Sequence, residues 1–206
     1  MIILLLHILG LIVSIIVVGT LLGFLFNHVS KFSKISNYGT SRLFDPFTNF
    51  VAIGVIIVYQ AYLGNSLQGM YSDIFNGFSF LLIAYCAVCI IINSVGDIND
   101  EYGMTKNDYV LRVALNLIFL VTSYGFVYWV IYCISPDSFT VIGVNIESLI
   151  RQLWQFWFYS FRVAVTYGDG TIIAIGIPSQ IIQVTEVIVF YFVIAKNIEK
   201  VFISQN

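Results

Sequence analysis

The chain has 206 residues, of which 59% are hydrophobic and 10% are charged, and its mean hydropathy is +0.93. Soluble domains carry about 25% charged residues, so this composition excludes a protein whose whole surface faces water. Its formal net charge is −2 and its Lys and Arg are scattered, which excludes a basic surface for a nucleic-acid partner. We therefore expect an all-α membrane protein whose partner is the lipid bilayer, with no soluble partner.

Five apolar segments predict transmembrane helices, and in chain order they are 2–26, 46–63, 74–93, 109–134 and 177–195. A helix needs about 20 residues to cross the hydrocarbon. The second segment is short and carries Asn49 and Gln60, so its crossing is an open question. The first has no basic residue at its start and no clear cleavage site, so we interpret it as a retained helix rather than a secretory signal.

Basic residues mark one side of the membrane. They follow the first segment, the third segment and the last segment, at Lys31, Lys34, Arg42, Lys106, Lys196 and Lys200. Because Lys and Arg favour the cytoplasmic side, we expect an outer N-terminus, a cytoplasmic C-terminus and an outward-facing stretch at 135–176. The expected location is the cell membrane.

Three cysteines, Cys86, Cys89 and Cys133, lie inside the apolar segments. A C-x-x-C pair without a second pair of ligands is weak evidence for a zinc site. Small packing thiols are the simpler interpretation. We expect no disulfide framework, no cofactor and no enzymatic activity, since no segment pairs a nucleophile with a base or a metal cluster.

The segment 145–165 predicts a short helix. Asn145 or Ser148 is a candidate N-cap, and Glu147 lies where a carboxylate favours the positive helix end. A dense aromatic cluster follows, at Trp154, Phe156, Trp157, Phe158, Tyr159 and Phe161. One interpretation is an aromatic belt at the membrane interface; the other is a re-entrant half-helix wedged between neighbouring spans. The second also explains the glycines that come next.

Those glycines belong to Thr166-Tyr167-Gly168-Asp169-Gly170. Glycine at alternate positions permits the positive φ that turns successive carbonyls toward one axis. Such carbonyls replace the hydration shell of a cation. We expect K⁺ or Na⁺ to be coordinated at Thr166, Tyr167 and Gly168. One loop cannot encircle an ion, so the prediction requires a homotetramer.

This region resembles the pore domain of the potassium-channel superfamily. The similarity is carried by Phe158-Tyr159-Ser160-Phe161, by the filter stretch 166–170, by Pro178-Ser179, by Glu186 and by Ile194-Ala195-Lys196. It implies a pore domain at 109–202, with an outer helix 109–134, a pore helix at about 148–165, a filter 166–170 and an inner helix 177–199. A transmembrane region of three helices at 1–108 would precede it, and a tail at 203–206 would follow.

The filter departs from the potassium-selective pattern. Asp169 stands where that family has tyrosine, and Thr171 where it has aspartate, which resembles bacterial channels that conduct both Na⁺ and K⁺. The resemblance therefore implies weak selectivity. Asp169 either forms a ring that attracts a divalent ion such as Ca²⁺ or bonds to nearby backbone. A register shifted by one residue would put β-branched Thr166 where φ > 0 is needed, so we prefer the unshifted one.

Four residues are expected to support the filter: Arg162, Glu186, Trp157 and Tyr159. Arg162 either pairs with Glu186 or Asp169 behind the filter or extends outward to the interface. Glu186 either braces the filter or lines the cavity as a cation-attracting ring. The segments before the pore lack a series of basic residues at every third position, so we expect weak or no voltage sensing.

The predicted function is passive conduction of monovalent cations. The alternative is a non-conducting membrane subunit or scaffold, in which the glycine stretch is only a turn. A secondary transporter is a weaker option, because such proteins show internal repeats and paired broken helices.

Overall fold

The computed structural model describes residues 2–32, 37–62, 67–96, 106–143, 146–166 and 171–203. Among these, four helical segments are long and apolar enough to cross a membrane: Ile2–Phe24, Met70–Val95, Tyr109–Ile134 and Ile177–Ile198. The apolar part of the predicted second span, Pro46–Tyr62, is shorter. The expectation of a mainly helical protein with helices of membrane-spanning length and composition is confirmed. By contacts the chain divides into two compact units, Met1–Ile90 and Ile91–Asn206.

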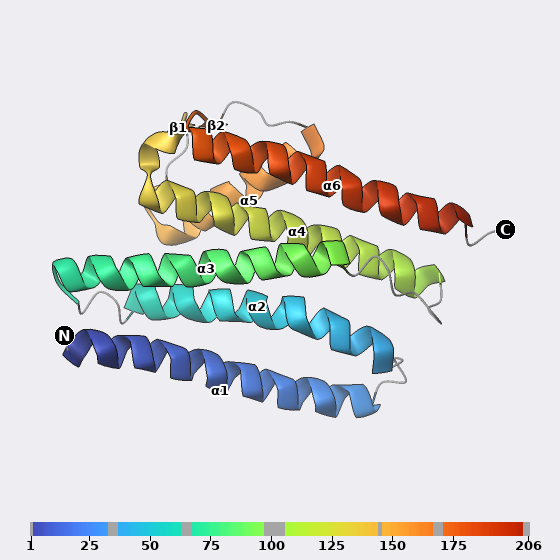
Figure 1. Cartoon of the computed structure of the whole chain (residues 1–206), viewed down its shortest axis with the longest axis horizontal. Coiled ribbons are helices and arrows are strands. Elements are labelled where there is room, and N and C mark those ends of the chain that lie inside the picture. The colour runs from blue at the N-terminus through green and yellow to red at the C-terminus, as the bar shows by residue number, and fades with distance from the viewer. Residues whose placement is uncertain are drawn as a thin grey trace. The chain divides into compact units, whose positions relative to one another are not determined.

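The first unit is built from α1 (Ile2–Phe32), α2 (Asn37–Tyr62) and most of α3 (Met70–Gly96), with α1 packed along α2 (Figure 1). An aromatic cluster joins the three helices, because the Phe75 ring lies 6.0 Å from the rings of both His7 and Tyr59. Beside it, the Gln60 amide donates to Asn76 Oδ1 at 3.1 Å. These contacts use polar groups as well as rings, which suits helix association in lipid, where apolar burial alone gives little driving force.

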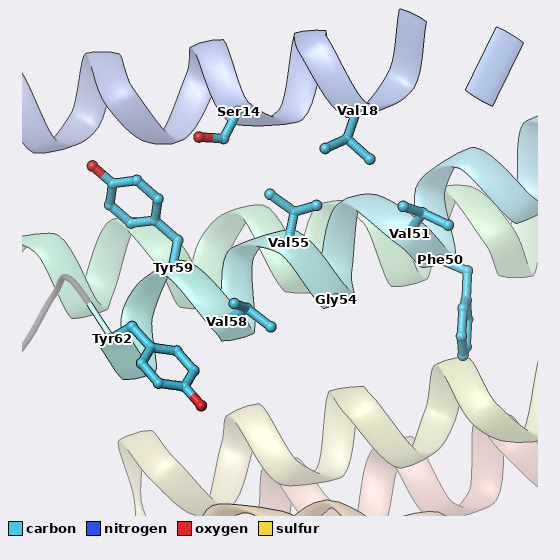
Figure 2. Close-up of a pocket in the computed structure, with 9 residues that line it drawn as sticks. All are labelled: Ser14, Val18, Phe50, Val51, Gly54, Val55, Val58, Tyr59 and Tyr62. Atoms are coloured by element: carbon cyan, nitrogen blue, oxygen red, sulfur yellow. The ribbon is translucent and has the colours of Figure 1, made fainter. Parts of the chain in front are cut away.

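A groove of about 660 Å³ lies between α1 and α2. Ser14 and Val18 of α1 face Val55 and Tyr59 of α2 across it (Figure 2). Gly54 leaves part of its floor open, since a Cβ there would meet nothing within 4 Å. Ser14 directs its hydroxyl to its own helix, at 2.8 Å from the Gly10 carbonyl. The groove therefore presents mainly carbon, as expected for a surface beside hydrocarbon.

The second unit contains α4 (Lys106–Ile134), α5 (Leu149–Thr166) and α6 (Ile177–Ile203), and each of these helices contacts the other two. The helices expected at 109–134, about 148–165 and 177–199 match them to within a few residues at each end, and their roles as outer, pore and inner helices stay predictions. Thr166, assigned to the filter, is the last residue of α5.

Two short strands, β1 (Phe139–Val141) and β2 (Ile172–Ala174), were not predicted from the sequence. They pair antiparallel, with Phe139 opposite Ala174 and Val141 opposite Ile172. Since β1 precedes α5 and β2 follows it, the pairing brings both ends of the intervening segment to the same end of the unit (Figure 1).

Gly125 sets the distance between α4 and α5. A Cβ at this position would lie 2.9 Å from the Trp157 Cα and 3.3 Å from the Phe156 carbonyl oxygen. Both neighbours are backbone atoms, which cannot move aside as a flexible side chain can. Small residues at such crossings let helix backbones approach closely in membranes.

We predict that Gly125→Ala lowers the free energy of unfolding by about 1–3 kcal/mol, because overpacking of this size forces backbone shifts. Thermal unfolding of the purified protein in detergent measures it. Gly77→Ala in α3 is the matched control, since a Cβ there meets nothing within 4 Å, and it should leave the midpoint unchanged or raised. Equal midpoints for the two variants would contradict the packing argument.

Candidate functional site

The candidate site is built around α5, an 18-residue helix between the apolar spans of α4 and α6. Ser148 caps its start, because the Arg151 amide donates to the Ser148 hydroxyl at 3.4 Å. Of the two predicted caps, Ser148 is thus confirmed, and Asn145 lies outside the described residues. Gln152 anchors the first turn, since its side chain donates to the Ile146 carbonyl at 2.9 Å and accepts from Trp129 Nε1 of α4 at 3.1 Å.

A buried carboxyl group joins all three helices of the unit. Glu186 of α6 is 0% exposed. The Tyr128 hydroxyl of α4 donates to its Oε2 at 2.7 Å, and the Ser160 hydroxyl of α5 bonds its Oε1. Ser160 Oγ also lies 2.7 Å from the Val121 carbonyl of α4. Glu186 thus lies where a brace against α5 would lie. A residue that lined an open cavity would instead be exposed to solvent.

Tyr159 and Trp157 attach two faces of α5 to the rest of the unit. The Tyr159 ring is 4% exposed and packs edge-on against Tyr128, with 4.9 Å between ring centroids. Trp157 Nε1 donates to Thr122 Oγ1 of α4 at 3.0 Å, and its ring stacks on Phe161 at 6.4 Å. Both residues therefore hold α5 in place, and their support of a filter stays a prediction.

Arg162 lies in the last turn of α5, and its described contacts are with Thr171 and Phe158. Its guanidinium donates from Nη1 to Thr171 Oγ1 at 2.8 Å and lies 4.6 Å from the centre of the Phe158 ring. Glu186, one expected partner, is held by Tyr128 and Ser160 instead; Asp169, the other, lies outside the described residues. The Arg162–Thr171 bond connects the residues on either side of the predicted filter.

Of the predicted filter itself, Tyr167, Gly168, Asp169 and Gly170 lie outside the described residues. Thr166 ends α5, and Thr171 begins the return to β2. The structure therefore describes Thr166 and Thr171, the residues on either side of 167–170, and Arg162 in the last turn of α5 bonds Thr171.

A compact hydrogen-bonded turn connects β2 to α6. The amides of Ile175 and Gly176 both donate to the Ser138 carbonyl at 3.0 Å, and the Ser179 hydroxyl donates to the same oxygen at 2.8 Å. A Cβ on Gly176 would lie 2.8–2.9 Å from atoms of Ser138, so only glycine permits this approach. The return from α5 into α6 is thereby tied to the end of α4.

Sequence reasoning missed several of these residues. Tyr128 and Thr122 are ordinary members of an apolar span, and nothing in their spacing marks them. Thr171 was noted only as a departure from the potassium-selective pattern, and Gln152 not at all. A polar residue with hydrogen-bonding capacity inside or beside a membrane segment is the one available signal, because such groups need partners in lipid.

The described residues contain no group of three or more His, Cys, Asp or Glu side chains that could hold a metal ion. The three cysteines are free thiols. No protein-family model, no curated protein and no solved structure matches the chain.

We predict that Glu186→Ala lowers the free energy of unfolding by about 1–3 kcal/mol, because it removes the acceptor of the buried Tyr128 hydroxyl and leaves Ser160 with the Val121 carbonyl alone. Glu186→Gln should cost much less. Its amide oxygen can accept from Tyr128, and its N–H can donate to Ser160, which then donates to Val121. Thermal unfolding in detergent compares the variants.

The control is Thr185→Ala, because Thr185 is exposed and its hydroxyl bonds only the Ile181 carbonyl of its own helix, at 2.8 Å. This variant should unfold close to the wild-type midpoint. If Glu186→Gln proves as damaging as Glu186→Ala, the three-helix network does not stabilise the unit in the way described.

Proposed function

We propose that the chain is one subunit of a tetrameric cation channel. In this proposal α4 is the outer helix, α5 the re-entrant pore helix, 166–170 the filter and α6 the inner helix. The observation that carries it is the path of the chain between two apolar spans. The β1–β2 pair brings the segment containing α5 back to the end at which it began, and α5 is not itself among the helices apolar enough to cross.

The proposed ion path follows from the end of α5. Helix carbonyls at a C-terminus carry partial negative charge, and α5 ends at Thr166, immediately before the glycine-spaced stretch. Four such ends around one axis would favour a cation there. Backbone carbonyls of Tyr167 and Gly168, with Thr166, would replace its water shell.

Irregular backbone at membrane depth is tolerated only where protein buries it or water hydrates it. The hydrogen bonds of Glu186 and Arg162 supply such protein support on the side of α5 and Thr171. An axis shared by four copies would supply water on the other side. Both supports are needed for the proposed filter.

The permeant ions in this proposal are K⁺ and Na⁺. With Asp169 in place of an aromatic residue, the outer carbonyl rings lose packing that would fix their radius, so discrimination between the two ions is weak. The proposal also includes a possible divalent site at Asp169, weak or no voltage sensing, and a cell-membrane location with a cytoplasmic C-terminus.

The test is bilayer recording of the purified tetramer with Na⁺ on one side and K⁺ on the other. We expect current that reverses near zero. A strongly potassium-like reversal potential would refute the weak selectivity, and absence of current from a preparation with verified tetramers would favour the non-conducting scaffold.

A second test replaces the filter acid. Asp169→Tyr restores the aromatic packing group, so the K⁺/Na⁺ permeability ratio should rise severalfold. Asp137→Tyr, which changes an exposed acid in the short helix η3 (Pro136–Ser138), is the matched control and should leave the ratio at the wild-type value. An unchanged ratio in Asp169→Tyr counts against the filter assignment.

A further inference from the structure

Two polar attachments join α4 to α6, one near each end of their shared interface. Toward the β1–β2 end, the Tyr128 hydroxyl bonds Glu186. At the opposite end, the Tyr109 hydroxyl donates to Asn197 Oδ1 at 2.7 Å and lies 3.3 Å from the Asn197 carbonyl oxygen. The second attachment has no counterpart in the predictions made from the sequence.

The Asn197 side chain faces Tyr109 and is largely shielded from solvent. Its side chain is 8% exposed, on the same face of α6 as Val193 and Glu186, which are both 0% exposed. Its amide Nδ2 donates to the Val193 carbonyl at 2.6 Å, which orients Oδ1 toward Tyr109. A buried amide that loses its partner in an apolar surrounding costs free energy, so this bond stabilises the conformation in which the two helix ends touch.

Helix α6 has no site at which to bend between the two attachments. Sharp bends in helices arise at proline, glycine or π-bulges. The segment 187–194 contains neither proline nor glycine, and α6 is continuous from Ile177 to Ile203. When α6 moves as a straight helix held at Glu186, its far end is therefore displaced by a swing about that attachment.

The part of α6 between Glu186 and Asn197 is long enough that a small rotation about Glu186 breaks the Tyr109–Asn197 hydrogen bond. Asn197 follows Glu186 by eleven positions, which is about 16 Å of helix. A rotation of about 10° moves Asn197 by about 3 Å over that length, which takes the Tyr109–Asn197 pair beyond hydrogen-bond range. The pair is thus made or lost as a unit when α6 moves.

We propose that Tyr109 and Asn197 form a latch that holds the far ends of α4 and α6 together and must open for α6 to swing. The mechanical role stands on the geometry of one subunit. The gating role rests on the proposed channel function, because in a channel the swing of α6 changes the width of the conduction path.

The first experiment measures the mechanical role and needs no current. Spin labels are placed at Val110→Cys and Ile198→Cys, which are exposed positions next to the latch residues, at 56% and 52%. Cys86, Cys89 and Cys133 are replaced by Ser, and labelled chains are diluted with unlabelled ones in lipid vesicles. The unmodified latch should give one narrow distance distribution, and Tyr109→Phe should add a second, longer distance.

The second experiment measures gating by single-channel recording. Tyr109→Phe and Asn197→Leu should each change the ratio of open to closed probability by about 3-fold to 18-fold, in the same direction, which corresponds to the mean and the maximum measured for hydrogen bonds between helices in a membrane. The double variant should change it no further than either single one. Tyr71→Phe, which removes an exposed hydroxyl from α3, is the matched control and should leave both readouts unchanged.

The outcomes separate the two ideas. An unchanged distance distribution in Tyr109→Phe overturns the latch, whether or not the protein conducts. A changed distribution with unchanged open probability overturns its gating role. A changed distribution in a tetramer that carries no current leaves the latch in place and refutes the channel proposal together with the gating role.

Discussion

The second unit depends on the hydrogen bonds that converge on Glu186. One fully buried carboxyl group receives the Tyr128 hydroxyl from α4 and the Ser160 hydroxyl from α5. Hydrocarbon offers no replacement partners, so separating any one helix leaves a polar group unsatisfied. In a soluble protein apolar burial would hold three such helices together; in a membrane that term is nearly absent. Directional polar bonds and close backbone contact therefore decide how α5 lies.

Close contact comes from two glycines. Gly125 lets α5 approach the backbone of α4, and Gly176 lets the start of α6 approach Ser138. Together with the β1–β2 pair, these contacts bring the two strands that flank α5 to one end of the unit. The residues that flank the proposed filter belong to this framework, because Arg162 of α5 donates to Thr171. This framework lies at the β1–β2 end of α4 and α6. The movement proposed at Tyr109 and Asn197 lies at the opposite end of the same two helices.

Much of the helical plan follows from local sequence. The apolar runs at 109–134 and 177–195 predicted α4 and α6, and Ser148 predicted the start of α5 through its hydroxyl. The resemblance also singled out Glu186 as a possible brace. It gave no hint of Tyr128 as the partner, because a tyrosine inside an apolar span looks like any other large side chain. Nothing in the local sequence pattern indicated that Arg162 donates to the Thr171 hydroxyl.

By itself, the sequence determined that this chain is embedded in a membrane and where most of its helices lie. The physical reason is that hydrocarbon requires helices of about 20 apolar residues with their backbone bonds satisfied internally. Only the tertiary structure decided which polar side chains meet. Partners such as Tyr128 and Glu186, or Tyr109 and Asn197, are 58 and 88 residues apart, and their pairing depends on how whole helices pack.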